Sequence, residues 1–398
     1  MRFAGIDIGG ERHAVAVVND NGALLVKSTL FGEDAVGYQR LREVLGDPND
    51  CLVAMEATGH YWRNLFAFLV GQGFKVALLN ALRTRRFAEE ELERTKTDSV
   101  DALGIARFAA QKRPVPTPVA DEVTAELREL VRLRTRYVDE HSDRVRQLHR
   151  AVDLGFPEFT CHVRMNTVLA TAILARYPTA RSYSGVSVRK LARLAYDGRH
   201  QVGEILARAL IETAKISVGS HHSEAYGLQV KYTCSDMELL RNRVKQLDQE
   251  IEGKLQTHEV GKLLTTIDGI GSRTAACLIA ELGDPSRFRD AAALASYVGV
   301  VPRLRQSGKR SFSGARGFPL GNARLRHRLW MPTLVAVRKN PWLRAHYDRL
   351  LAAGKGPKVA IVACMRKLLG AIYSVARNRR PFVPRLATAG HEQPMTAG

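Results

Sequence analysis

The first 115 residues alternate short apolar runs with polar and amphipathic stretches. Two apolar runs, 14–18 and 23–26, flank the turn sequence Asn19-Asp20-Asn21-Gly22, a pattern typical of a β-hairpin. The hairpin continues from an apolar run that ends near Asp7. The remaining pattern predicts a helix over 33–45, a strand ending at Glu56, a helix over 62–70, a strand over 75–79 and a helix that carries Asp98 and Asp101.

Three strands followed by alternating helices and strands predict an α/β layer of the ribonuclease-H-like type. Pro114, Pro116 and Pro118 follow it and read as a stiff linker. We therefore expect a first domain over residues 1–118.

The middle of the chain, residues 119–257, is charged and predicts long helices. Valines recur at every seventh position, at 131, 138, 145 and 152, with Leu127 and Leu148 in the companion row and Arg134 and His141 interrupting it. A second stretch, from Leu240 to Leu255, shows a similar repeat of apolar residues. Three readings stay open: an antiparallel helical hairpin, an intermolecular coiled coil, or amphipathic helices on the subunit's own core. Between about 156 and 230 lies a less regular insert.

From 258 the pattern predicts a mainly helical domain that ends near 385. Two helices flank the turn Gly269-Ile270-Gly271, as in a helix-hairpin-helix. Such a turn presents backbone N–H groups at a helix N-terminus, which suits a phosphate, although glycine turns between helices are also common for structural reasons. Residues 386–398 lose the apolar periodicity and predict a disordered tail.

The net charge of the chain indicates the class of its binding partner. Sixty Lys and Arg against 40 Asp and Glu give a formal net charge of +20, and the cations are spread along the chain. This balance predicts a polyanion partner, most simply nucleic acid. Five scattered cysteines form no CxxC pair, which fits a reducing cytoplasm, and no apolar run predicts a membrane span or signal peptide.

Four carboxylates carry the candidate chemistry. Asp7 and Glu56 end apolar runs, and Asp98 and Asp101 share one helix face. Carboxylates that converge repel one another unless a cation lies between them, so the set predicts a divalent metal site. All-oxygen ligands favour Mg²⁺ or Mn²⁺.

These residues also carry a family resemblance. The chain resembles the DEDD transposases of bacterial insertion sequences, the insertion-sequence one-hundred-and-ten family, which are bridge-RNA-guided recombinases. The resemblance covers both ends of the chain. It rests on Gly5-Ile6-Asp7, Met55-Glu56-Ala57-Thr58-Gly59 with Tyr61, Lys96-Thr97-Asp98-Ser99-Val100-Asp101-Ala102, Ile267-Asp268-Gly269-Ile270-Gly271, Val301-Pro302-Arg303, Gln306-Ser307-Gly308 and Met365-Arg366-Lys367-Leu368.

The resemblance implies a RuvC-like catalytic domain, a coiled-coil region and a transposase domain with a nucleophilic serine. It implies that Asp7, Glu56, Asp98 and Asp101 hold Mg²⁺ and that Ser307 attacks a DNA phosphate. It also implies a homo-oligomer, from dimer to tetramer, that binds donor DNA, target DNA and a structured bridge RNA. The segment between the proline linker and the Gly-x-Gly turn is longer than the family pattern.

The basic segment around the serine is consistent with that role. Expected nucleic-acid contacts are Gly269, Gly271, Arg303, Arg305, Lys309, Arg310 and Arg316. Metal ions can polarise a phosphate and help activate a hydroxyl, which is otherwise a poor nucleophile. By itself, a Ser-Gly pair is most often a loop serine in a turn, and Ser311 and Ser313 are nearby competitors.

Three other functions compete. A Holliday-junction resolvase would use the same four acids to activate water and would form no covalent adduct. A sugar kinase or actin-like ATPase shares a sequence like Gly5-Ile6-Asp7-Ile8-Gly9-Gly10 but needs a later nucleotide loop, which the sequence lacks, and has no use for the net charge. A scaffold without catalysis would leave the acids without a purpose.

Overall fold

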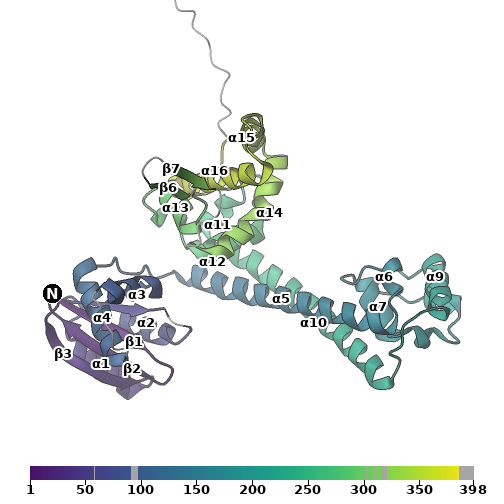
Figure 1. Ribbon diagram of the computed structural model, residues 1–398, viewed down its shortest axis with the longest axis horizontal. Helices are drawn as coiled ribbons and strands as arrows, with labels where there is room; N and C mark the ends of the chain where they lie inside the picture. The colour runs from purple at the N-terminus through teal and green to yellow at the C-terminus, as the bar shows by residue number, and fades with distance from the viewer. Residues whose placement is uncertain (58, 91–96, 302, 308–309, 315–320, 385–398) are drawn as a thin grey trace, which may run out of the picture. The chain divides into compact units, whose positions relative to one another are not determined.

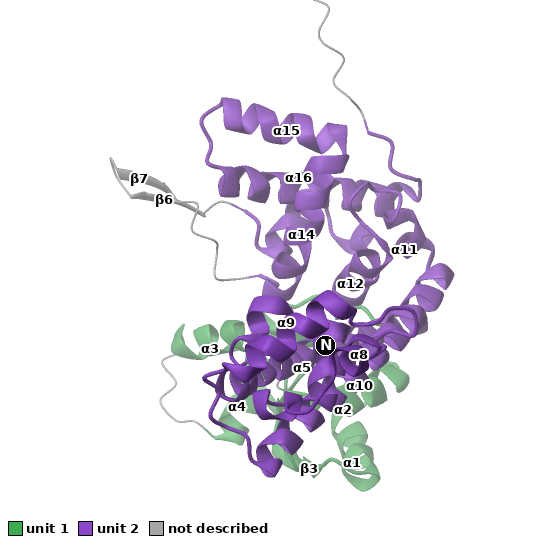
Figure 2. Ribbon diagram, turned by 90° about the vertical axis from the view of Figure 1, so that its right-hand side faces the viewer, with its two compact units in different colours: residues 1–119 green, residues 120–398 purple. Residues whose placement is uncertain are grey.

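The computed structural model describes residues 1–384 apart from 58, 91–96, 302, 308–309 and 315–320, and only the backbone within 303–314. The chain forms two compact units, residues 1–119 and 120–398 (Figure 2). Residues 386–398, where a tail was predicted, lie outside the described residues.

The first unit is a five-stranded mixed sheet with helices on both faces (Figure 1). Its elements are β1 (Arg2–Ile8), β2 (Arg12–Val18), β3 (Leu24–Gly32), α1 (Ala35–Leu45), β4 (Cys51–Glu56), α2 (Trp62–Gly71), β5 (Lys75–Leu79), α3 (Ala81–Glu90) and α4 (Asp98–Lys112). The strand order is β3-β2-β1-β4-β5, antiparallel among the first three and parallel from β1 to β5. The predicted hairpin, strands and helices are confirmed, and the sheet is compatible with a ribonuclease-H-like layer.

Successive side chains of a strand point to opposite faces of the sheet, and helices cover both faces. In β1, Ala4 and Ile6 pack with helices α1 and α2, whereas Phe3 packs with α3 and α4. Because side chains alternate in a strand, Gly5 and Asp7 lie on the α4 side with Phe3. The sheet is therefore buried on both faces, and its acid-bearing strand ends lie next to α4.

Two features of this unit were not predicted. Helix α3 has a strongly polar sequence, and its apolar face is reduced to the buried residues Thr84 and Phe87. The proline segment is also more than a spacer. The Thr117 amide donates to the Val76 carbonyl oxygen at 2.7 Å, and the Thr117 hydroxyl accepts from the Leu78 amide at 2.8 Å. The segment therefore runs along the edge strand β5.

The second unit is mainly helical. Its elements are α5 (Glu122–Gly155), α6 (Phe159–His162), α7 (Val168–Arg176), the 3₁₀ helix η1 (Ala180–Tyr183), α8 (Val188–Ala192), α9 (Glu204–Lys215), α10 (Glu224–Thr257), α11 (Glu259–Leu264), α12 (Ser272–Leu282), η2 (Pro285–Arg287), α13 (Ala291–Val298), β6 (Arg303–Ser307), β7 (Arg310–Gly314), α14 (Ala323–Lys339), α15 (Pro341–Ala352) and α16 (Pro357–Asn378). The β6–β7 hairpin was not predicted, because a strongly basic run hides its alternation.

Helices α5 and α10 are both 34 residues long and pack against each other. Three ion pairs join them, Glu126–Lys254, Arg134–Asp248 and Arg144–Asp236. Partner numbers fall along α10 as they rise along α5, so the two helices run antiparallel. The hairpin lies within one chain, and a coiled coil between chains stays a prediction.

The insert folds as an ordered lobe of short helices, turns and loops, less regular than the two 34-residue helices that flank it. Helices α6 to α9 bury a cluster that includes Phe156, Phe159, Ile173 and Leu210 and that packs on one end of the α5–α10 hairpin. These helices are 4 to 12 residues long. Runs of that length are too short to show a clear helical period.

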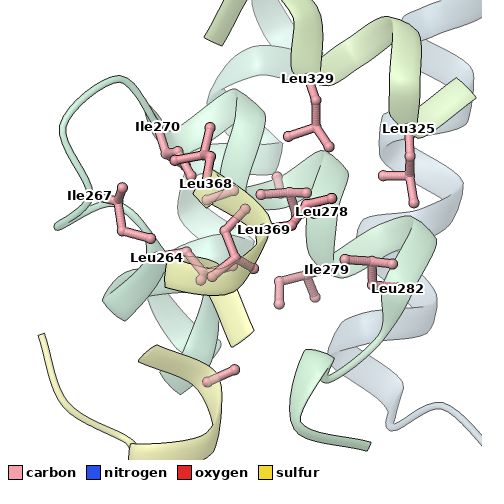
Figure 3. Packing of buried hydrophobic residues seen from close by; sticks show 14 of the residues in the cluster. Leu264, Ile267, Ile270, Leu278, Ile279, Leu282, Leu325, Leu329, Leu368 and Leu369 are labelled. Carbon is pink, nitrogen blue, oxygen red and sulfur yellow. The ribbon is translucent and has the colours of Figure 1, made fainter. Parts of the chain in front are cut away.

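The largest core lies at the other end of the hairpin. Leucines and isoleucines from α11, α12, α14 and α16 meet there, among them Leu264, Ile279, Leu329 and Leu368 (Figure 3). Within the described residues, α16 is the one helix long and apolar enough to span a membrane, and 56% of that stretch is buried in the fold. Its apolar composition is therefore accounted for by this core.

Candidate active site

Asp7 and Glu56 lie side by side at the ends of neighbouring strands. Strands β1 and β4 are parallel, with Ile6 opposite Met55, so the next residue of each strand is an acid. Both acids are half-buried. The register of an extended sheet thus aligns two carboxylates on the α4 face.

Helix α4 brings the second pair of acids to this point. Thr97 caps the helix, its hydroxyl accepting from the Val100 amide at 3.3 Å, and Asp98 and Asp101 lie in the first turn. A Cβ on Gly5 would lie 2.2 Å from the Ala102 carbonyl oxygen, so the backbone of α4 rests directly on β1. Only glycine permits this approach.

The electrostatics show that the four acids interact. Burial, followed by the charges of Asp101, Asp98 and Glu56, raises the pKa of Asp7 to about 6, against the opposing effect of the Ile8 amide. Like charges that share a site favour protonation of one of them. The N-terminus of α4 offsets part of this repulsion for Asp98 and Asp101, because negative charge is stabilised in the first turn of a helix.

Thr84 is a site neighbour that sequence reasoning missed. Its buried hydroxyl lies 3.0 Å from the carbonyl oxygen of Ala81, to which it donates. The same hydroxyl also contacts Oε1 of Glu56. This contact orients the Glu56 carboxylate from helix α3. No spacing or motif marks Thr84, since it becomes relevant only when α3 packs beside β4.

The donor set fits a divalent cation, although the side chains do not yet surround one. Among the described residues, no three acid, histidine or cysteine groups are close enough to ligate one ion as they stand. Carboxylate oxygens are the ligands that Mg²⁺ and Mn²⁺ prefer. The pKa of Asp7 is raised by burial and then by the charges of neighbouring acids, and a bound cation would relieve that repulsion.

The predicted serine segment belongs to the second unit. Ser307 ends β6 and is paired with Arg310 of β7, immediately beside the undescribed residues 308–309. Ser311 and Ser313 lie opposite Gln306 and Leu304 in the same hairpin. Side chains of Arg303, Arg305, Ser307 and Arg310 lie outside the described part, as do Lys309 and Arg316 entirely.

The two glycines of the predicted phosphate turn differ. Gly269 has φ +97°, and a Cβ there would lie 2.6 Å from the Cβ of Ala336 on α14, so packing alone accounts for it. Gly271 is the N-cap of α12, and a Cβ there would meet nothing within 4 Å. Only Gly271 therefore has room for a ligand.

A groove of about 980 Å³ adjoins this turn. Its Arg134 and Arg273 both pair with Asp248, at 2.7 and 3.7 Å, and a hydrogen bond from Ser272 holds the pKa of Glu252 below its ordinary value at the start of α12. These carboxylates neutralise much of the positive potential that the turn could offer a phosphate.

Two family models match the chain. One, described as a DEDD transposase of the IS110 type, covers residues 4–157, and the other, described as the transposase IS116/IS110/IS902 family, covers residues 261–348. The first match contains all four acids, and the second contains the Gly-x-Gly turn and Ser307.

Relatives agree with the models over most of the chain. A mini-circle putative transposase for IS117 from Streptomyces coelicolor is 27% identical over 97% of this chain and 96% of its own length. An uncharacterized 43.6 kDa protein of insertion element IS110 from the same organism is 28% identical over 79% and 78%. A pilin gene-inverting protein from Moraxella bovis is 27% identical over 83% and 82%. The chain therefore belongs to the IS110 family of DEDD transposases, DNA recombinases that cleave DNA and transfer its strands.

Proposed function

We propose that this chain cuts and rejoins the DNA of an insertion sequence under the guidance of a structured RNA, with a Mg²⁺- or Mn²⁺-binding carboxylate site and Ser307 as nucleophile. The observation that carries the catalytic part is the convergence of two strand-end acids with two helix acids at Asp7, whose pKa is raised to about 6 by burial and then by the charges of its three acidic neighbours. Such perturbed carboxylates mark functional sites.

The protein residues have separate roles in this proposal. Asp7, Glu56, Asp98 and Asp101 would hold the cation, and Thr84 would orient Glu56. The bound cation would polarise the phosphate and stabilise charge on its oxygens. Ser307 Oγ would form a bond to phosphorus and displace a sugar oxygen, which takes up a proton. Attack by a sugar hydroxyl on the phosphoserine would then rejoin DNA without ATP.

Subunit and RNA partners follow from the resemblance. The serine of one subunit would complete the carboxylate site of another in a dimer or tetramer. Base pairing with the guide RNA would supply sequence specificity, and the net charge of +20 would supply affinity for donor DNA, target DNA and RNA. The first check is RNA that copurifies with the protein and whose digestion abolishes recombination.

The carboxylate role is tested by amide variants. Asp7→Asn, Glu56→Gln, Asp98→Asn and Asp101→Asn should each abolish strand cleavage and leave RNA binding largely intact, because each keeps the side-chain shape and removes one charge. Glu43 is exposed on α1, so Glu43→Gln is the matched control and should cleave normally. Cleavage retained by any two of the four site variants would refute the assignment.

The serine role is tested by the covalent intermediate. Ser307→Ala should eliminate a denaturant-resistant protein–DNA adduct, whereas Ser311→Ala and Ser313→Ala should retain it. An adduct that persists in Ser307→Ala and maps to another residue by mass spectrometry would show that the nucleophile lies elsewhere.

One observation favours a second candidate function. The same four carboxylates would hold cations that activate a water molecule as well as cations that activate a serine hydroxyl. The site could then serve a resolvase-like nuclease that uses metal-activated water. Cut DNA without any adduct in the unmodified protein would select this function over the serine mechanism.

A further inference from the structure

The excess positive charge is concentrated in one segment, although cations occur throughout the chain. Residues 291–391 hold 20 Lys and Arg against a single acid, Asp348, and the rest of the chain holds 40 cations against 39 acids. Almost the whole net charge of +20 therefore comes from this segment. A net charge of this size and sign attracts polyanions.

This segment also forms a groove of about 1090 Å³, bounded by the start of α15, one face of α16 and the chain that follows α16. Trp342 and Phe382, both half-buried, line it with ring centroids 5.4 Å apart and planes at 66°. Lys367 Nζ lies 4.1 Å from the centroid of the Trp342 ring. Exposed Arg380 adds a guanidinium group to the same groove.

The two cations of this groove are free of acidic partners. Lys367 donates to the Trp342 carbonyl oxygen at 3.4 Å, and among the described residues neither Lys367 nor Arg380 has a carboxylate within ion-pair distance. Burial, followed by the charge of Arg349, lowers the pKa of Lys367, so an incoming anion would be stabilising. The groove at Gly271 differs, because Asp248 pairs with both Arg134 and Arg273 there.

We propose that the groove at Trp342 and Phe382 binds a single-stranded segment of nucleic acid, with a base against the aromatic pair and phosphates at Lys367 and Arg380. Flat aromatic faces beside unpaired cations are the common means of holding single strands without reading sequence. A duplex fits poorly, because its bases are stacked on one another. Single-stranded RNA and a displaced DNA strand share this chemistry.

The proposal uses no residue of the carboxylate site or the serine segment. Binding is therefore measured in EDTA with the full chain, so that failure of the catalytic proposal leaves this result unaffected. The probes are fluorescent 12-residue oligo(U), 12-residue oligo(dT) and a 12-base-pair duplex, each titrated at one fixed salt concentration. Tighter binding of oligo(U) assigns the groove to RNA, and tighter binding of oligo(dT) assigns it to DNA.

Three variants define the contribution of the groove. Phe382→Leu keeps apolar volume but removes the ring face, Arg380→Ala removes the exposed cation, and Arg366→Ala removes an equally exposed arginine of α16 that does not line the groove. Phe382→Leu should weaken single-strand binding by roughly 5-fold or more, the loss expected for one stacked base. Arg380→Ala should weaken it more than Arg366→Ala does, and duplex binding should change less than single-strand binding.

Specific outcomes would overturn the proposal. Equal losses of single-strand affinity in Arg380→Ala and Arg366→Ala would show that Arg380 contributes only general surface charge. Unchanged single-strand affinity in Phe382→Leu, with circular dichroism showing a folded protein, would exclude stacking. Tighter binding of the duplex than of both single strands would also refute it. A photo-crosslink from 5-iodouracil in the probe to a peptide containing Trp342 or Phe382 is the expected positive result.

Discussion

The chemistry of Asp7 depends strongly on its surroundings. Its carboxyl group is ordinary, but burial and three nearby acids raise its pKa to about 6. Between pH 4 and 6 the folded protein therefore binds a proton that the unfolded chain has released. The free energy of unfolding consequently falls as pH rises through this window, and the metal-free protein carries this penalty at neutral pH.

Because the pKa of Asp7 is raised in the folded protein, an uncharged residue at this position should stabilise the metal-free protein. In EDTA at pH 8, Asp7→Asn should raise the free energy of unfolding by on the order of 1 kcal/mol, a value reduced because the group is partly exposed. At pH 4 the difference from the unmodified protein should vanish, since Asp7 is then protonated. Thermal unfolding at both pH values measures it, with Glu43→Gln as control.

Mg²⁺ provides the complementary check. It should raise the unfolding temperature of the unmodified protein and have a smaller effect on Asp7→Asn, because a ligand that binds the folded state stabilises it. A stability at pH 8 that is equal or lower in Asp7→Asn would contradict the electrostatic account of this site.

At the scale of elements, the packing of α4 on β1 decides whether the acids meet. Gly5→Ala would place a methyl group 2.2 Å from both the Ala102 carbonyl oxygen and the Ala106 amide nitrogen. We expect α4 to shift, stability to fall by about 1–3 kcal/mol as in other overpacked cores, and cleavage to fall further.

Gly71→Ala is the matched control for that change. Gly71 ends α2, and a Cβ there meets nothing within 4 Å, so stability should stay equal or rise slightly. Denaturant unfolding and DNA cleavage measure both variants. Normal cleavage by Gly5→Ala would mean that the contact of α4 with β1 does not set the positions of Asp98 and Asp101.

The α5–α10 hairpin is held mainly at its two ends. Leu148 is fully buried in the insert cluster, and Val131 and Ile251 join the carboxy-terminal core, whereas Val138 and Val244 in the middle are only half-buried. Polar Arg134 and His141 occupy positions between them. The apolar residues of the repeat therefore pack mainly into two separate cores, one at each end of the hairpin, and do not form one continuous seam.

That division predicts that truncations at the ends of the hairpin cost more stability than truncations in its middle. Leu148→Ala should destabilise the protein by about 2–5 kcal/mol, as expected for a buried leucine, and Val138→Ala by less than about 1 kcal/mol. Urea unfolding of the two variants checks the order. Comparable losses would indicate that a partner chain covers Val138, as in an intermolecular coiled coil.

At the scale of the whole molecule, the positive charge of the carboxy-terminal segment predicts salt-dependent binding of nucleic acid. Phosphate contacts release counterions, so affinity for DNA and RNA should fall steeply with salt, by roughly 10³-fold between 50 and 200 mM if six or more phosphates are contacted. Fluorescence anisotropy across that range measures the slope. A flat response would show that the charge is only solvated.

The sequence by itself determined the local elements of this protein and the family to which it belongs. Alternating and helical periods located β1, β4 and α4, and those elements carry Asp7, Glu56, Asp98 and Asp101 at ends that the register then aligns. These features are readable because they depend on neighbours within a few residues. The net charge, which depends on composition alone, indicated a polyanion partner.

Only the tertiary structure decided the contacts between distant positions. Gly5 is an ordinary strand glycine until α4 packs on it, and Thr84 is an ordinary helix residue until it reaches Glu56. Trp342 and Phe382 are 40 positions apart, and no periodicity links them before α15 and α16 fold together. The physical reason is that such pairs are selected by burial and close packing in three dimensions, which leave no regular spacing along the chain.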